Sequence, residues 1–305
     1  MSRTCGDYRP IVDGSLRDVS LAVPLSDITA FFDDVYDPAW AESWDAVGLV
    51  CGVPDQPVER VMFAVDPVAA VVIEAIEWGA DLIITHHPLL LRPVSSVAAT
   101  TPKGRVVHRL IAAGVALYTA HTNADIADPG VSDALARAVG LTGPLRPLAP
   151  AADLAAGPVA GPSRAPGRGH GRIGAVAAPM SLADFAAQAA RGLPATAGGV
   201  RVAGDPDRTI RTVAVCGGAG DSLLGAARAA GVDVFLTADL RHHPASEFAE
   251  HDDGPALVDA AHWATEWPWL ADAERLLTGA LDLRTRVSTL VTDAWTISEG
   301  SEGAK

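Results

Sequence analysis

Hydrophobic residues along this 305-residue chain recur in short runs that alternate with amphipathic stretches. In the most apolar region, 61–85, four carboxylates interrupt the hydrophobic positions: Asp66, Glu74, Glu77 and Asp81. A membrane span needs about 18 or more uninterrupted apolar residues, so this region instead predicts a strand, a helix and a second strand. An earlier helix is expected to begin near Ser26, a good N-cap residue, and to end before Pro38.

The strand–helix–strand pattern occurs twice. Segment 61–85 aligns with segment 213–237, and each reads as strand, turn, helix, glycine, aspartate, strand and threonine. An HHP triplet follows each segment, at His86–Pro88 and at His242–Pro244. Such units imply parallel strands with right-handed crossovers. The chain therefore predicts an α/β fold of two similar α/β domains, an internal pseudo-repeat whose strand ends meet in one cleft.

Composition sets the expected domain limits. Residues 1–22 and 297–305 are polar or mixed and are expected to be disordered extensions. Segment 143–171 is rich in proline, glycine and alanine, and it has too few large apolar residues to offset the entropy of ordering. It is expected to be a flexible linker or surface loop. The two α/β halves then cover 23–142 and 172–296.

Charge and cysteine content exclude several classes of protein. A net charge of −14 argues against general nucleic-acid binding, which needs a basic face for the phosphates. Cys5, Cys51 and Cys216 are odd in number and widely spaced, which argues against a disulfide framework. The first residues lack the apolar core of a signal peptide, and no membrane span is expected. We expect a soluble, cytoplasmic protein.

Histidines and carboxylates lie where predicted strands end. His86 and His87 follow the run ADLIIT, and two further pairs follow the runs VALYTA and ALVDAA: His121 with Asp125, and His262 with Glu266. Ligands collect at strand ends in open α/β sheets. His, Asp and Glu without Cys are the ligands of hydrolytic metal centres. Six donors suit two ions that share a bridging carboxylate, with a metal-bound hydroxide as the nucleophile.

The spacing of these donors leaves alternatives open. Adjacent strand residues point to opposite faces, so either the backbone turns at Thr85 or the rings of His86 and His87 serve two ions. His262 and Glu266 stand one turn apart at the start of a predicted helix, as in metal-binding helices.

Two weaker signals lie in the second half. The string CGGAGDS (216–222) separates a predicted strand from a helix and is either a tight turn or a seat for a substrate phosphate. One of His242 and His243 is expected to lie near the metals.

Six strings together resemble the GTP cyclohydrolase 1 type 2 homologues, also called the Nif-three-like family. The similarity runs from about residue 24 to about 280, in the family's order. The strings are ESWDAVGLVCG (42–52), THHPLLL (85–91), HTNAD (121–125), CGGAGDS (216–222), LTADLRHH (236–243) and VDAAHWATEWP (258–268). The resemblance implies a two-domain α/β protein with a dinuclear metal site, assembled as a toroidal homohexamer.

The same resemblance assigns roles to residues. His121 becomes a supporting residue that orients a ligand or acts on the substrate, and it is taken with Asp45 as a candidate catalytic residue. Two divalent ions are implied, and nitrogen and oxygen donors suit zinc, manganese or iron. The family's metal ligands map, with one carboxylate bridging, onto His86, His87, Asp125, His262 and Glu266.

The chain departs from the family pattern at two positions. Ala46 follows Trp44-Asp45 where the family usually has asparagine, and Ala238 precedes Asp239 where the family usually has glycine. Both changes leave the ligands intact and bear on substrate recognition. The large central insertion of longer family members is also absent.

These features favour a metal-dependent hydrolase acting on a nucleotide or another phosphate-bearing small molecule. The family name points to opening of the guanine ring of GTP, with a carboxylate or His121 moving protons. A non-catalytic metal-binding or regulatory scaffold is the alternative outside enzymes. A dinuclear phosphatase or phosphodiesterase is the alternative within them, because ligand geometry fixes the metals and not the pocket around them.

Overall fold

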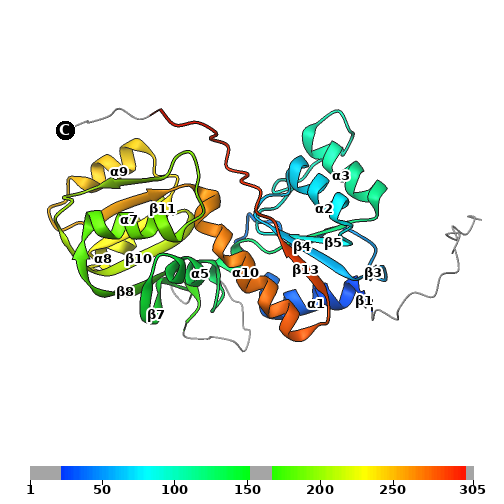
Figure 1. Ribbon diagram of the computed structural model, residues 1–305, viewed down its shortest axis with the longest axis horizontal. Coiled ribbons are helices and arrows are strands. Elements are labelled where there is room, and N and C mark those ends of the chain that lie inside the picture. Colours follow the sequence, from blue (N-terminus) through cyan, green and yellow to red (C-terminus); the bar gives the residue numbers. More distant parts are fainter. Residues whose placement is uncertain (1–21, 152–166, 300–305) are drawn as a thin grey trace, which may run out of the picture.

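The structure, a computed structural model, describes residues 22–151 and 167–299. Two α/β lobes lie side by side, and one long helix runs between them (Figure 1). Of the extensions expected at 1–22 and 297–305, residues 1–21 and 300–305 lie outside the described residues, as does 152–166. No helix in the described part of the chain combines the length and apolar character needed to cross a membrane.

The first lobe is built on a five-stranded sheet in the order β13-β4-β5-β6-β2. Its first four strands are parallel, and β2 is antiparallel to β6. A separate antiparallel pair joins β1 (Val23–Pro24) to β3 (Pro57–Val58). The strands of the sheet are β2 (Gly48–Cys51), β4 (Arg60–Ala64), β5 (Leu82–Thr85), β6 (Ala116–Thr119) and β13 (Arg284–Val287).

Alternating side chains of β4 serve two hydrophobic cores. Val61 and Phe63 pack into the core that contains α1, whereas Met62 and Ala64 pack into the core that contains α2 and α3. This period of two is what a strand buried on both faces requires. The helices are α1 (Leu25–Val35), α2 (Ala69–Trp78) and α3 (Pro102–Ala113).

Helix α1 ends before Pro38, as the sequence predicts, but it begins earlier than expected. Its first residue is Leu25, and the residue at the N-cap position is Pro24, which makes no side-chain capping bond. The hydroxyl of Ser26 instead lies 3.4 Å from the carboxylate of Asp27. The prediction that Ser26 caps this helix is therefore wrong.

The second lobe is built on a six-stranded sheet in the order β7-β8-β10-β11-β12-β9. Strands β10, β11 and β12 are parallel, and the other three pair antiparallel. Helices α5 (Val131–Ala138) and α7 (Leu182–Gly192) contribute to the core on one face, and α8 (Leu224–Ala229) and α9 (His242–Ala249) to the core on the other. The strands are β7 (Leu141–Pro150), β8 (Gly169–Ser181), β9 (Val200–Ala203), β10 (Thr209–Ala219), β11 (Val234–Ala238) and β12 (Ala256–Ala260).

Strands β7 and β8 correct the expected linker. They pair antiparallel, with Pro150 opposite Gly169, so the described parts of segment 143–171 belong to one sheet and do not join two halves. Proline lacks the N–H that a central strand must donate, and it is tolerated because β7 is an edge strand. The prolines and glycines concealed the strand pattern.

The predicted repeat is visible in matching hydrogen bonds. The β4–α2–β5 and β10–α8–β11 units both have parallel strands, and left-handed Gly79 and Gly231 follow their helices at equivalent positions. Asp81 then accepts two successive backbone N–H groups, at 2.8 and 2.9 Å. Asp233 does the same in the second lobe, at 2.8 Å each. The two lobes therefore share local geometry as well as strand order.

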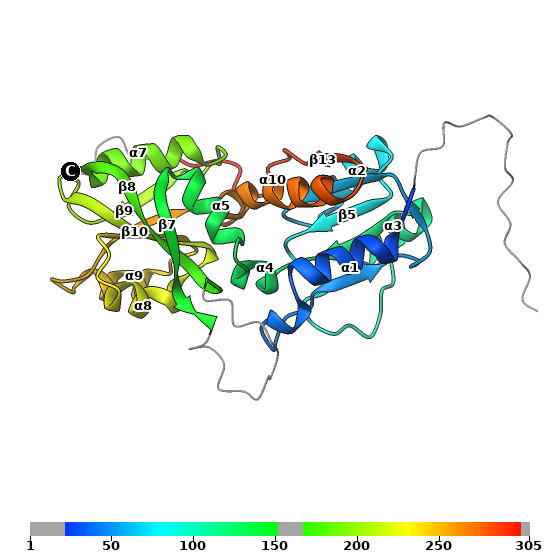
Figure 2. The ribbon, with the colours of Figure 1, turned by 90° about the horizontal axis from the view of Figure 1, so that it is seen from below.

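Helix α10 (His262–Ala280) connects the two lobes. It begins after β12, contacts β10 and β11 of the second sheet and β4 of the first, and leads into β13 (Figure 2). Trp269 and Leu277 of this helix are fully buried in a core that side chains of both sheets share. The C-terminal end of the chain thus completes the first sheet.

Candidate metal centre

His86 and His87 leave β5 together and face one cluster of polar side chains. The chain bends at these two residues, directly after Thr85, while their N–H groups still donate to the carbonyl oxygens of Ala64 and Val65. Their ring centroids lie 5.2 Å apart. His86 is fully buried and His87 is partly exposed. The bend after Thr85 is what brings both rings to the same place.

Glu266 lies at the centre of the cluster. Its Oε1 is 2.9 Å from Nε2 of His262 and 3.5 Å from Nε2 of His86, and its Oε2 is 2.9 Å from Nε2 of His87. Oδ1 of Asp125, on the short helix α4 (Thr122–Ile126), is 3.7 Å from Nε2 of His86. The structure therefore brings together all five side chains that the sequence suggests as ligands.

All four histidines around the cluster hold their Nδ1 atoms against an acceptor. An imidazole that donates from Nδ1 keeps the lone pair of Nε2 for a metal or a proton. Every Nε2 is thereby left to face the cluster. The acceptors are Ala120 O for His86 (2.9 Å), Asp66 for His87 (2.7 Å), Asp45 for His121 (2.8 Å) and Asp239 for His262 (2.7 Å).

Asp66 and Asp239 are site residues that the sequence analysis missed. Asp66 follows β4 and Asp239 follows β11, so both occupy the strand-end position that drew attention to the histidines. Asp239 adopts a positive φ of 56°, a region that aspartate enters more readily than most residues. The overlooked signal was a lone carboxylate directly after a predicted strand.

Protons on the histidines balance the negative charge of Glu266 within the cluster. Burial alone would raise the pKa of Glu266, but His262, His87 and His86 hold it well below its usual range. Glu266, opposed by burial and aided by Asp239, raises the pKa of His262 to about 11. Burial opposes the charge on His87, yet Glu266 and Asp66 outweigh it and raise its pKa to about 10. The cluster is thus arranged to hold positive charge around one carboxylate.

The donor set fits a metal. Among the described residues, His86 Nε2 is buried without a hydrogen-bond partner, and such an atom needs another explanation. Two ligands bound about 2.0–2.2 Å from one tetrahedral ion lie about 3.3–3.6 Å apart. The separations of His86 Nε2 from Glu266 (3.5 Å) and Asp125 (3.7 Å) are close to this range, whereas His87 and His262 lie at hydrogen-bond distance from Glu266. Donor atoms lie within 4.8 Å of one another in two groups: His86, His87 and His121, and His87, His262 and Glu266.

His121 and Asp45 form a pair at the rim of the cluster. The carboxylate of Asp45 is fully buried and also accepts hydrogen bonds from the backbone and the hydroxyl of Thr122. Although burial opposes its charge, the bonds from His121 and Thr122 hold the pKa of Asp45 well below its usual range. Trp44, 57% exposed, meets the His121 ring edge-on. The pair is held rigidly beside the ligand candidates.

The glycine-rich string 216–222 is not an anion seat. The N–H of Gly217 donates to Ser132 Oγ, that of Gly218 to Thr265 Oγ1, and that of Gly220 to the carbonyl oxygen of Ala238. These groups are therefore unavailable to a phosphate, and that interpretation is wrong. Gly218 instead gives Glu266 room, because a Cβ at its φ of +67° would lie 2.5 Å from Oε1.

Among the described residues, neither His242 nor His243 forms a hydrogen bond or an ion pair with a side chain of the cluster. Both are exposed at the start of α9, and their rings contact each other at 5.1 Å. The structure gives no support to the expectation that one of them lies near the metals. The equivalent place after β11 is taken by Asp239.

Comparison with known proteins places the chain among named relatives. Residues 23–296 match the family model described as Duf34/NIF3 (NGG1p interacting factor 3). A Streptomyces coelicolor protein named "GTP cyclohydrolase 1 type 2 homolog" is 55% identical over 277 residues, covering 89% of this chain and 93% of its own. A Mycobacterium tuberculosis protein of the same name is 40% identical over 373 aligned residues, covering 91% and 98%.

Solved structures agree with the sequence matches. A Bacillus cereus protein related to NIF3 superimposes with a TM-score of 0.79 at 25% identity, over 91% of this chain and all of its own. A hypothetical protein of Staphylococcus aureus gives a TM-score of 0.79 at 29% identity, covering 90% of this chain and 99% of that one.

Proposed function

Since this chain belongs to the Duf34/NIF3 family, we propose that it is a metal-dependent hydrolase with two divalent ions between its lobes. Its substrate is a nucleotide or another phosphate-bearing small molecule. One observation carries the proposal: the buried carboxylate of Glu266 faces Nε2 atoms of three histidines whose Nδ1 atoms are already engaged. A structural ion pair would not need three such imidazoles.

The distances suggest how the ligands divide. His86 and Asp125 would hold one ion, His87 and His262 the other, and Glu266 would bridge them. Nitrogen and oxygen donors suit zinc, manganese or iron. When bound, such ions polarise the bond under attack and lower the pKa of a nearby water molecule.

We assign proton transfer to His121, with Asp45 as its positioning residue. The buried carboxylate fixes Nδ1 of His121, which leaves Nε2 to carry a proton at the rim of the cluster. The position of His121 within 4.8 Å of His86 and His87 also permits a ligand role. The two roles differ in outcome, because loss of a ligand removes metal and loss of a proton carrier removes only turnover.

The names of the relatives suggest the reaction to test first, which is hydrolytic opening of the guanine ring of GTP. Phosphatase and phosphodiesterase activities use the same pair of ions and are the next candidates. A homohexamer is the proposed assembly, which light scattering of the purified protein measures directly.

The decisive experiment combines elemental analysis with a substrate screen. Protein reconstituted with zinc, manganese or iron is assayed on GTP, other nucleotides and p-nitrophenyl phosphate, with His121→Ala as the matched variant. We expect two ions per chain in both proteins, and turnover at least 100-fold slower in His121→Ala. Full metal occupancy without any turnover would instead favour the non-catalytic scaffold. A variant with one ion fewer would make His121 a ligand.

A further inference from the structure

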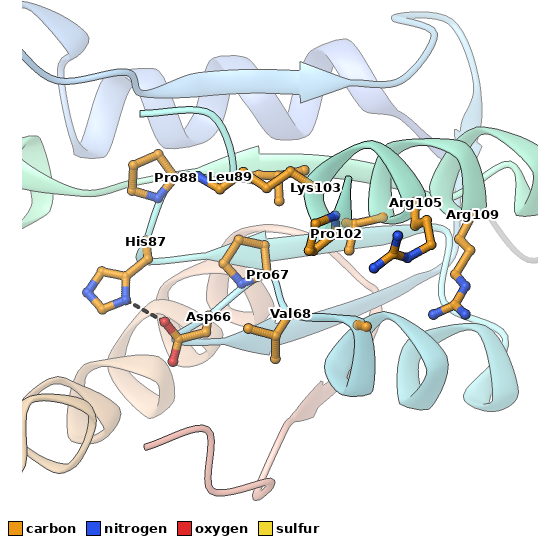
Figure 3. Close-up of a pocket in the computed structure, with 12 residues that line it drawn as sticks. Asp66, Pro67, Val68, His87, Pro88, Leu89, Pro102, Lys103, Arg105 and Arg109 are labelled. Atoms are coloured by element: carbon orange, nitrogen blue, oxygen red, sulfur yellow. Dashed lines mark hydrogen bonds and ion pairs between the residues drawn. The ribbon is translucent and has the colours of Figure 1, made fainter. Parts of the chain in front are cut away.

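A cavity adjoins the cluster. It has a volume of about 390 Å³, within the range of small-molecule sites, and lies between the ends of β4 and β5 and helix α3. Figure 3 shows His87 and Asp66 at one end, and Val68 and Leu89 in the middle. His87 therefore belongs both to the cluster and to the wall of this cavity.

The end of the cavity away from His87 carries positive charge. Helix α3 supplies Lys103, Arg105 and Arg109 to its wall, and the two arginines lie at the far side in Figure 3. Arg105 donates to the carbonyl oxygen of Ala99 at 3.5 Å. Within the described residues none of the three has a carboxylate within ion-pair distance.

Some arginines elsewhere in the described part of the chain are neutralised by a neighbouring carboxylate. Arg137, Arg201 and Arg241 each form an ion pair with an aspartate, as expected in a chain with a net charge of −14. Other arginines in the described part of the chain, such as Arg60 and Arg191, also lack an ion pair, so what marks this place is the grouping of three cations within seven residues on the wall of one largely apolar cavity. An anion in this place would gain charge-assisted hydrogen bonds without breaking existing pairs.

We propose that this cavity binds the phosphate of the substrate as a handle, at the α3 end, while the reacting group lies at the His87 end. Its occupant is a phosphate ester on a planar apolar body, which the walls of Val68, Leu89 and Val106 receive. This proposal rests on the proposed function, because one substrate spans both sites. It favours reaction at the apolar body over hydrolysis of the phosphate itself.

The test measures binding without metal, so that a phosphate on the ions cannot imitate one in the cavity. GMP and guanosine are titrated into chelator-treated protein by calorimetry. The variants are Arg105→Gln/Arg109→Gln and, as the control, Arg92→Gln, an exposed arginine outside the cavity wall. We expect GMP to bind at least tenfold tighter than guanosine, and the double variant to abolish that difference while Arg92→Gln preserves it.

Three results would overturn the proposal. They are equal binding of GMP and guanosine, an equal loss in the Arg92→Gln control, and no binding of GMP to the metal-free protein. None of them bears on the proposed hydrolase, which is assayed with metal bound. Conversely, a protein that holds two ions and turns over nothing would leave the GMP measurement intact.

Discussion

At equivalent places after the second strand of each repeat, the first lobe carries His86 and His87 whereas the second carries Ala238 and Asp239. The bonding at the other end of these strands is the same, since Asp81 and Asp233 bind the neighbouring strand alike. Equivalent backbone positions therefore place different side chains at the cluster: His87 in the first lobe contacts Glu266, whereas Asp239 in the second lobe accepts from His262.

After the third strand the lobes become similar again. His121 and Asp125 follow β6 with the spacing of His262 and Glu266 after β12. Glu266, however, contacts three imidazoles, whereas Asp125 lies within 4.0 Å of His86 alone among the described histidines. The difference teaches that residues at equivalent positions need not contribute equally to the cluster, and the five predictions below compare such residues and the charges around them.

The largest effect on metal content is expected when the carboxylates of Glu266 and Asp125 are removed one at a time. Glu266→Ala should lose both proposed ions, with affinity falling more than about 100-fold, because even the partners of metal ligands cost about 10–100-fold when removed. Asp125→Ala should keep the ion held by His87 and His262. Elemental analysis after dialysis gives the stoichiometry. Equal metal content in the two variants would contradict the asymmetry.

Metal binding should release protons from both lobes. In the metal-free protein the pKa of His87 is about 10 and that of His262 about 11, so both are protonated at neutral pH. Apparent affinity should rise about tenfold per pH unit for each proton displaced, up to these values. Calorimetry in buffers of different ionisation enthalpy counts the protons, and a buffer-independent heat would refute the prediction.

The same pKa values set the stability of the metal-free fold. Because they lie above the value of about 6.5 expected in the unfolded chain, their contribution is fully present below that pH. It is lost as the pH rises through 10 to 11. Urea denaturation of chelator-treated protein at several pH values measures this loss.

Substitution of two glycines distinguishes the effect of backbone strain from the effect of crowding Glu266. Gly218→Ala and Gly231→Ala both place a side chain at positive φ, which costs about 1–2 kcal/mol of unfolding free energy. Nothing lies within 4 Å of a Cβ at Gly231, whereas one at Gly218 meets Glu266. Only Gly218→Ala should weaken metal binding, by about tenfold. Equal affinity in both variants would show that Glu266 moves freely.

The smallest effect on metal binding is expected for two aspartates that hold neighbouring strands together, Asp81 and Asp233. Asp81→Ala and Asp233→Ala each leave two backbone N–H groups without their acceptor. Each substitution should lower the unfolding free energy by a similar amount, about 1–3 kcal/mol, and leave the metal content unchanged. Burial opposes the charge of Asp233, but the N–H groups of Thr212 and Arg211 lower its pKa. Its contribution is therefore present above about pH 4 and lost on acidification. Urea denaturation at pH 7 and pH 3 compares the two.

The sequence alone predicts the strand order within each repeat and the ligand candidates, because both follow from short-range patterns. An apolar run followed by His86-His87, or a histidine four residues before Glu266, marks a strand end or a helix start without any knowledge of the fold. That residues so far apart meet follows from the parallel strands of both lobes.

Other features depend on contacts that no local pattern encodes. Asp66 and Asp239 gain their roles from histidines on other strands, so each reads locally as a turn residue. Strand β7 contains prolines that its edge position tolerates, which composition cannot reveal. The phosphate-seat interpretation failed because Ser132 and Thr265, distant in sequence, already accept the glycine N–H groups.

Helix α10 and strand β13 also bear on how the protein is made. During translation, a nascent chain that ends after α9 holds four of the histidines and carboxylates of the first lobe, but neither Glu266 nor the edge strand of the first sheet. Glu266 leaves the ribosome only after most of the chain has been made, so the two proposed metal ions cannot be bound together by a half-synthesised chain. Capture of the proposed metals would thereby be coupled to completion of the polypeptide.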